Sequence, residues 1–428
     1  MSEKNQGQPE QPEARPEPPS APAKQPLRLV HASDFHLEDT LGGVAEVPDH
    51  LREVFLTAPF LAAEQVFELA IAEGADALLL SGDIANLELA GPRAVAFLTE
   101  QFDRLNDHNI GVYWAGGVAD PPGSWPPSTA LPENVHRFPA SGVEDFVLER
   151  RGERLARIQG VSRVPGKALD DSGFHRDAGG LFTVGVAHGS AASPGSEGDR
   201  LHYAALGGQH QRQTVDQSPG IAHYCGSPQG RSPAETGAHG CTLVVVDETG
   251  RVRTKLLPTD SARWLTGTVE LTSAADESSL LKLINDQVSQ FRQQHTRVDL
   301  LVTWRVLGTG PLVNRLRHGG LADELLRHLR REAGTSSPAL WHADLVCEEP
   351  MAVPQEWRDQ ETILGDLLQE FGKFDVNEDL QLDLAEFLPP QHQQGEFAAL
   401  AEVSTGADRE ALLRDASKLG LDLLTPDE

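Results

Sequence analysis

Short apolar runs, several of them followed at once by an acid or a histidine, dominate the chain between residues 27 and 258. They alternate with segments whose apolar residues recur at helical spacing, such as residues 60–72, and this alternation is typical of an α/β sheet protein. We therefore predict buried strands at residues 27–32, 75–81, 110–116, 181–188 and 201–207. Residues 241–257 predict a hairpin that turns at Glu248-Thr249-Gly250.

The residues at the ends of these predicted strands can bind a metal ion. Asp34 and His36 follow the first strand, Asp83 follows the second, His188 ends the fourth, and His210 follows the fifth. In an open α/β sheet, ligands bind outside the carboxyl ends of the strands, so we expect these five side chains to meet at one edge. Carboxylate and imidazole ligands suit Mn²⁺, Fe²⁺ or Zn²⁺, and Mn²⁺ is favoured where oxygen ligands predominate.

The order of these motifs resembles that of the calcineurin-like metallophosphoesterases, and in particular the SbcD/YhaO-type DNA repair exonucleases. The segment HASDFHLEDTLGG (31–43) is similar to the family's HTSDxHLG opening, and YCGSPQGR (224–231) with Glu235-Thr236-Gly237 resembles its YPGSPQGR…ETG segment. The resemblance is clear over residues 27–265, looser as far as residue 350, and faint beyond. The alternative is a sheet protein with incidental acids and histidines.

The resemblance implies two metal positions that share Asp83. Every ligand that the family uses for one position is present here: Asp34, His36, Asp83 and His210. The other position keeps Asp83 and His188, but its asparagine is replaced by Val118 and its second histidine by Gly208. We therefore expect one complete metal site, with Mn²⁺ or another divalent ion as cofactor, and one ion per chain rather than two.

The resemblance also implies a histidine that serves the leaving group, and this position is Ala119. Of the family's G-N-H-D motif only Gly117 and Asp120 remain. A positioned acid–base group contributes about 10²–10⁴-fold to a rate, so we expect reduced hydrolysis.

No neighbouring residue supplies the lost ligands. Asn106, His108 and Asn109 precede the predicted strand at 110–116 and would lie about 20 Å from its carboxyl end. Gln209 points to the face opposite His210, because side chains alternate along an extended segment.

The function implied by the resemblance is phosphodiester hydrolysis at DNA ends, beside an SMC/Rad-like coiled-coil ATPase. Two alternatives stay open. One is a non-catalytic, nuclease-like subunit that binds DNA ends or the ATPase, and the other is a single-metal phosphodiesterase for a small substrate. A homodimer is compatible with each of them.

We predict four regions in the chain. Residues 1–26 form a disordered Pro- and Glu-rich tail, and residues 27–262 form the metallophosphoesterase domain, a β-sandwich flanked by helices. Residues 263–350 form a smaller α+β capping domain, and residues 351–428 form a helical, acidic C-terminal region with 18 acids and 5 bases. This last region contains an EF-hand-like spacing, at Asp375, Asn377, Asp379, Gln381, Asp383 and Glu386. Leu380 stands where such a loop needs glycine, so we interpret it as an acidic segment between helices.

The charge of the chain limits its partners. A net charge of −28 argues against strong nonspecific binding of nucleic acid by the chain as a whole. Residues 315–331 are locally basic, and we favour a solvated helix face there over phosphate contacts. Three cysteines without CxxC spacing, no signal peptide and no long unbroken apolar run predict a cytoplasmic protein that does not span a membrane.

Overall fold

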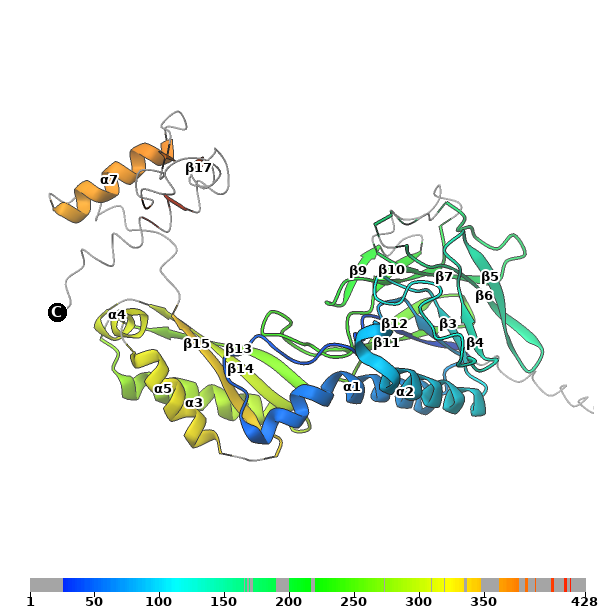
Figure 1. The fold of residues 1–428 in the computed structure, drawn as a ribbon, viewed down its shortest axis with the longest axis horizontal. Helices are drawn as coiled ribbons and strands as arrows, with labels where there is room; N and C mark the ends of the chain where they lie inside the picture. Colours follow the sequence, from blue (N-terminus) through cyan, green and yellow to red (C-terminus); the bar gives the residue numbers. More distant parts are fainter. Residues whose placement is uncertain are drawn as a thin grey trace, which may run out of the picture. The chain divides into compact units, whose positions relative to one another are not determined.

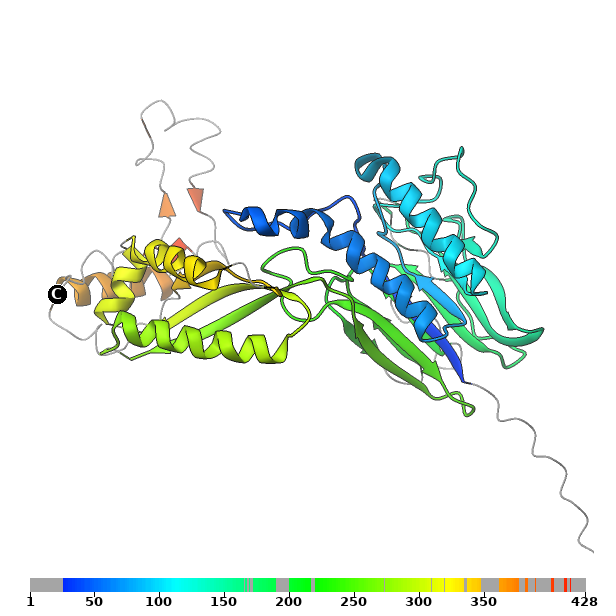
Figure 2. The same ribbon diagram turned by 90° about the horizontal axis from the view of Figure 1, so that it is seen from below.

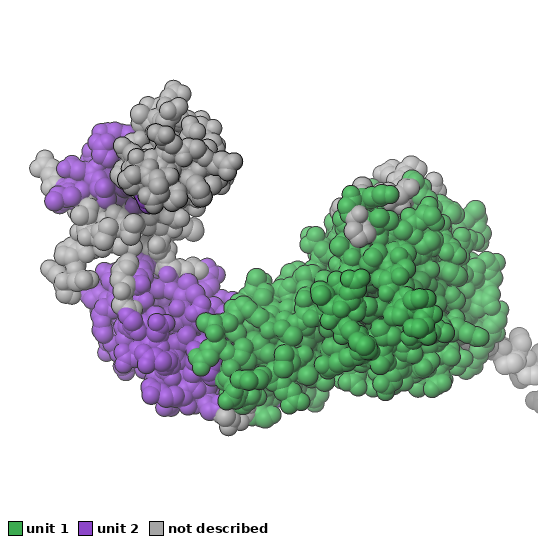
Figure 3. Space-filling model, in the orientation of Figure 1, with its two compact units in different colours: residues 1–265, 297–301, 337–339 green, residues 266–296, 302–336, 340–428 purple. Residues whose placement is uncertain are grey.

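The computed structural model describes residues 26–164, 166–167, 169, 172–189, 200–216, 220–272, 274–308, 310–318, 320–334, 337–347 and 362–376, with isolated positions beyond. The chain divides into two compact units (Figure 3), and unit 1 contains residues 1–265, 297–301 and 337–339. The predicted disordered tail lies outside the described residues except for Pro26, as do the EF-hand-like positions Asn377, Asp379, Gln381 and Glu386.

Unit 1 contains two six-stranded sheets (Figure 1). The first has the strand order β12-β11-β1-β2-β3-β4. Its strands β1 to β4 are parallel, and β11 is antiparallel to both β1 and β12. The strand bounds are β1 (Leu27–Ala32), β2 (Ala77–Leu80), β3 (Gly111–Trp114), β4 (Val135–Arg137), β11 (Gly240–Val246) and β12 (Val252–Pro258).

The second sheet has the order β5-β6-β7-β8-β10-β9. Strands β6, β7, β8 and β10 are parallel, and β5 and β9 are antiparallel edge strands. The bounds are β5 (Glu144–Arg150), β6 (Glu153–Val161), β7 (Phe182–His188), β8 (Tyr203–Gly207), β9 (Gln213–Asp216) and β10 (Ile221–Tyr224). Leu29 and Leu79 of the first sheet pack in one buried cluster with Ile158 and Val186 of the second, so the sheets form a sandwich.

Two long helices cover the other face of the first sheet (Figure 2). They are α1 (Arg52–Ala72), preceded by the short helix η1 (Asp49–Leu51), and α2 (Leu87–Asp107), which is broken at Gly91 with φ of 68°. Phe67 of α1 and Phe102 of α2 are buried in a cluster with Leu78 of β2. The α/β sandwich expected from the sequence is confirmed, and in the described part of unit 1 both α-helices flank the same sheet.

One described segment, Asp49–Ala72, is long and apolar enough to pass a membrane-span test, with a mean hydropathy of 1.5. The sequence prediction missed it because Glu64 and Glu68 interrupt the apolar run. Length and composition cannot distinguish a membrane span from a core helix. Here Val66 and Phe67 are fully buried in the cluster between α1 and the sheet, as in a core helix.

Unit 2 contains a three-stranded sheet of order β13-β14-β15, with α3 and α5 against one of its faces (Figure 1). Its elements are β13 (Ala262–Leu271), α3 (Glu277–Gln294), β14 (Asp299–Gly308), α4 (Pro311–His318), α5 (Leu321–Ala333), β15 (Leu340–Cys347), α7 (Ile363–Val376), β16 (Leu382–Asp383) and β17 (Glu402–Val403). Arg330 donates hydrogen bonds to His342 O and Ala343 O, so its guanidinium serves the packing of α5 on β15. The interpretation of the basic segment as a solvated face is therefore wrong for Arg330.

Candidate metal centre

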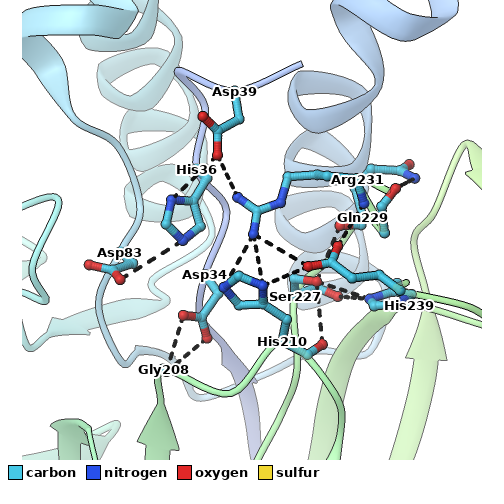
Figure 4. Close-up of polar contacts among 12 residues, drawn as sticks. Asp34, His36, Asp39, Asp83, Gly208, His210, Ser227, Gln229, Arg231 and His239 are labelled. Carbon is cyan, nitrogen blue, oxygen red and sulfur yellow. Dashed lines mark hydrogen bonds and ion pairs between the residues drawn. The ribbon is translucent and has the colours of Figure 1, made fainter. Parts of the chain in front are cut away.

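The predicted ligands follow the ends of strands that belong to both sheets of unit 1. Asp34 and His36 follow β1 and Asp83 follows β2 in the first sheet, whereas His188 ends β7 and His210 follows β8 in the second. The expectation of a single sheet edge is therefore wrong, because an apolar run shows that a strand is buried but not which sheet it joins. Figure 4 shows how Asp34, His36, Asp83 and His210 lie around one space.

Three of these residues adopt a backbone conformation that is rare outside glycine. The φ angles of Asp34, His36 and Asp83 are 56°, 46° and 52°. Such conformations cost about 1–3 kcal/mol each and cluster at functional sites. The loops after β1 and β2 hold each other in place, since Asp34 N–H donates to Gly82 O at 2.9 Å and His36 N–H donates to Asp83 O at 3.1 Å.

The complete group, defined as Asp34, His36, Asp83 and His210, presents carboxylate oxygens and imidazole nitrogens that could bind a cation. Ligand atoms of Asp34, His36 and His210 lie within 4.8 Å of one another. His210 Nδ1 lies 2.6 Å from Glu235 Oε1, so Nε2 is the nitrogen that a metal would use, and Arg231 Nη2 lies 3.2 Å from it. His36 Nε2 is buried without a hydrogen-bond partner among the described residues, and Asp83 Oδ2 lies 3.8 Å away. A divalent cation would satisfy this buried nitrogen, so the donor set fits such an ion.

The incomplete group, defined as Asp34, Asp83 and His188, also has its ligand atoms within 4.8 Å of one another. With His188 Nδ1 2.9 Å from Ser81 O, Nδ1–H donates to that carbonyl, and Nε2 lies 3.2 Å from Asp83 Oδ2. Val118 is 47% exposed and supplies no ligand atom. At Gly208 only the backbone N–H contributes, and it donates to Asp34 Oδ1 and Oδ2 at 3.1 and 3.0 Å.

His188 and Asp83 shift each other's pKa in opposite directions. Burial opposes ionisation of Asp83, but the hydrogen bond and charge of His188 outweigh it and lower the pKa of Asp83 to about 2. Burial also acts to lower the pKa of His188, but the hydrogen bond to Asp83 and the charges of Asp83 and Asp34 raise it. His188 and Asp83 thus satisfy each other.

The remnant of the G-N-H-D motif holds its loop against Asp83. The Asp120 carboxylate accepts hydrogen bonds from Asp83 N–H at 2.8 Å, Gly117 N–H at 2.7 Å and Trp114 Nε1–H at 2.6 Å. Complete burial nevertheless raises the pKa of Asp120 to about 6. Ala119 N–H donates to Asp83 Oδ1 at 2.7 Å. Asp120 and the backbone of Ala119 therefore hold the loop against Asp83, although Val118 and Ala119 offer no ligand or acid–base side chain.

Glu235 and Arg231 border the complete group, and the sequence showed them only as parts of the YhaO-type segment. Burial opposes ionisation of Glu235, but the hydrogen bonds to His210 and to Arg231 N–H lower its pKa to about 2. Arg231 Nη1–H donates to Asp39 Oδ2 at 2.8 Å, and Nη2 lies 2.9 Å from His210 Nδ1 and 3.2 Å from Nε2 (Figure 4). Motif order alone does not show such contacts.

Glu38 and Asp39 adjoin the complete group, whereas Gln209 and the pocket along α2 do not belong to it. Glu38 and Asp39 form a further cluster with His36, whose Nδ1 lies 3.2 Å from Glu38 Oε1. Gln209 is exposed and belongs to neither group. A pocket of about 980 Å³ lies along α2 and contains none of the predicted ligands.

Comparisons with known proteins agree with the motifs. No protein-family model matches the chain. The uncharacterised metallophosphoesterase YhaO of Bacillus subtilis (strain 168) is 26% identical over 372 residues, which are 83% of this chain and 89% of that protein.

Two solved structures are also similar. A putative 5'-nucleotidase from Staphylococcus aureus in complex with α-ketoglutarate matches with a TM-score of 0.34 and 13% identity, over 62% of this chain and 59% of that one. Vacuolar protein sorting 29 from Cryptosporidium parvum matches with a TM-score of 0.23 and 14% identity, over 55% and 98%. The chain thus spans less than two thirds of the nucleotidase. In its similarity to YhaO and in its ordered ligand motifs, the chain resembles the metallophosphoesterases.

Proposed function

We propose that the chain is a manganese-dependent phosphodiesterase of the DNA-end exonuclease type, which holds one ion tightly and turns over slowly. The observation that carries this proposal is the contrast between the two groups of the centre. In the complete group the ligand atoms of Asp34, His36 and His210 converge, Asp83 Oδ2 lies 3.8 Å from His36 Nε2, and that buried nitrogen has no hydrogen-bond partner among the described residues. In the incomplete group Val118 and Gly208 offer no side-chain ligand and His188 pairs with Asp83.

The reaction is the hydrolysis of a phosphodiester. A water oxygen forms a bond to phosphorus and gives up a proton to solvent, while the bond from phosphorus to the leaving oxygen breaks and that oxygen takes up a proton from solvent. Asp34, His36, Asp83 and His210 would hold a divalent ion, which when bound would supply a Lewis acid for the phosphate oxygens. The chain's own residues orient the metal-binding histidines. Glu235 fixes the ring of His210, and Ser81 O fixes the ring of His188.

The slow turnover follows from Ala119, which offers the leaving oxygen no proton. A positioned acid–base group contributes about 10²–10⁴-fold to a rate. We expect the hydrolysis rate to be lower by this order than that of a homologue with a histidine at position 119.

DNA ends are the proposed substrate because the segment from Tyr224 to Gly237, which resembles that of the SbcD/YhaO-type exonucleases, places Arg231 and Glu235 against His210. A coiled-coil ATPase is the proposed partner, with a homodimer as the assembly. Cys225 and Cys241 are buried free thiols, which fits the reducing cytoplasm.

The test combines metal counting with a nuclease assay on one sample. We expect about one Mn²⁺ per chain, as carboxylate and imidazole ligands favour, and slow, manganese-dependent release of nucleotides from end-labelled duplex DNA. Asp34→Asn serves as the metal-site control. Two tightly held ions would contradict the single-site proposal.

A second candidate is a subunit that binds DNA ends without cleaving them, and the observation that favours it is again Ala119. DNA-end binding with one ion bound and no nucleotide release would select it. Cleavage of bis(p-nitrophenyl) phosphate but not of DNA would select a small-substrate phosphodiesterase instead.

A further inference from the structure

Arg163 lies beside the incomplete group, although no motif marks it. Strand β6 runs parallel to β7 with Val161 opposite Ala187, which brings Arg163 next to Gly189. A methyl group on Gly189 would lie 2.8 Å from Arg163 Nη1 and 3.5 Å from Cζ. Arg163 N–H donates to Gly116 O at 2.8 Å. The residue therefore adjoins both the end of the His188 strand and the loop that has lost its asparagine and histidine.

The Arg163 side chain has no counterion in the described part of the chain. Its Nε is buried and makes no hydrogen bond there, and no described acid lies within ion-pair distance. Other arginines of unit 1 are paired: Arg150 with Asp76, Arg157 with Asp145 and Asp177, and Arg231 with Asp39. In a chain of net charge −28, an unpaired guanidinium at the edge of a metal centre is available to an anionic ligand.

Gly208 borders the same part of the centre as Gly189. A methyl group on Gly208 would lie 3.4 Å from Gly189 N and 3.2 Å from His188 Nε2. A side chain at position 208 would therefore start in tight contact with His188, and glycine avoids this contact. Arg163 also borders Gly189.

We propose that Arg163 is a phosphate-binding residue, and that its guanidinium contacts the substrate's phosphodiester on the side that lacks the second set of metal ligands. A guanidinium is always charged and presents N–H donors in a planar fork that matches two phosphate oxygens. It supplies positive charge where the family uses a cation. The identification of the ligand as a DNA-type diester rests on the proposed function.

The test measures binding of thymidylyl-thymidine, which contains a single phosphodiester, by titration calorimetry with EDTA and again with Mn²⁺. Arg163→Gln should weaken binding about tenfold in both conditions, since hydrogen bonds to charged groups contribute more than neutral ones. Arg163→Lys keeps the positive charge but loses the planar guanidinium. Its affinity for the dinucleotide should lie between those of the wild type and Arg163→Gln. Arg154→Gln, at the other end of β6, makes the same change in net charge and should bind like the wild type.

Equal affinity of the wild type and Arg163→Gln would overturn the inference, as would no binding by the wild type in Mn²⁺. The Arg163 N–H bond to Gly116 is made by the backbone, so the variants should keep the wild-type melting temperature. If binding depends on Arg163 but the protein holds no Mn²⁺ or releases no nucleotides, the proposed function fails while this inference stands.

Discussion

The two groups of the metal centre share Asp34 and Asp83 but differ in how their histidines are held. In the complete group, Glu235 orients His210 from the outside, and the free nitrogen of His36 has no hydrogen-bond partner among the described residues. In the incomplete group, His188 is held by Ser81 O on one side and by Asp83 on the other. The comparison shows two features that weaken a metal site. Two ligand positions are occupied by Val118 and Gly208, and the remaining ligands His188 and Asp83 pair with each other.

The arginines beside the two groups also differ in whether they have an ion-pair partner. Arg231, beside the complete group, is paired with Asp39, whereas Arg163, beside the incomplete group, has no ion-pair partner in the described ranges. If the two groups have different roles, the complete group should bind the cation, and Arg163 beside the incomplete group should bind the phosphate anion.

The largest effect is expected for Asp34→Asn, because Asp34 belongs to both groups. The substitution removes a buried negative charge but keeps an oxygen for the Gly208 N–H. Mn²⁺ affinity should fall by at least about 100-fold, since hard divalent ions depend on carboxylate charge. Calorimetric titration with Mn²⁺ measures this. A wild-type dissociation constant in the variant would show that the ion binds elsewhere.

The second prediction compares the contributions of His210 and His188 to Mn²⁺ affinity. His210→Ala should weaken Mn²⁺ binding by about 10–100-fold, because it removes a ligand of the complete group. His188→Ala should change it by no more than about threefold, as expected of a residue outside the occupied site. Metal titration of both variants checks this. Similar losses for the two would mean that the ion bridges both groups and would remove the distinction between them.

The strands and the ligand positions could be predicted because buried parallel strands appear as short apolar runs with polar residues directly after them. The prediction for β1 matches the structure at both ends, and Asp34, Asp83 and His188 stand at strand ends as expected. The hairpin of β5 and β6 escaped prediction because charged residues such as Arg154 interrupt it. Helix α2 escaped because Gly91-Pro92 breaks its pattern.

The environment of the ligands could not be predicted, because it depends on contacts between distant segments. Arg163 carries no motif, and its place beside Gly189 follows from the pairing of β6 with β7. The positive φ of Asp34, His36 and Asp83 is likewise set by the bonds between the loops after β1 and β2, since non-glycine residues rarely adopt it alone.

The third prediction is to restore the incomplete group with Val118→Asn, Ala119→His and Gly208→His. Val118 is exposed, and the Ala119 bond to Asp83 is made by the backbone, so the first two changes should be tolerated. At Gly208 φ is 95°, and a side chain there should cost about 1–3 kcal/mol of stability. The triple variant should hold a second Mn²⁺ and cleave phosphodiesters about tenfold faster.

Each of these single substitutions should do little, because ligands and acid–base groups act as a unit. Elemental analysis and cleavage of bis(p-nitrophenyl) phosphate measure the outcome. A folded triple variant that takes up two ions and remains no faster would show that these three positions alone do not limit the site.

The smallest effect is expected for Arg231→Gln, and it separates the roles of the two arginines. Arg231 Nη2 lies 3.2 Å from His210 Nε2, the nitrogen that is left for a metal, so its positive charge opposes a cation in the complete group. Removing the charge should tighten Mn²⁺ binding by about threefold at physiological salt, where screening and the partly solvated rim weaken the repulsion. Arg231→Lys should not tighten it, and Arg104→Gln, on α2, controls for the change in net charge. Arg163→Gln should leave Mn²⁺ affinity unchanged and weaken only the diester. If Arg163→Gln tightens the metal as much as Arg231→Gln does, both arginines act on one cation and the two groups form a single site.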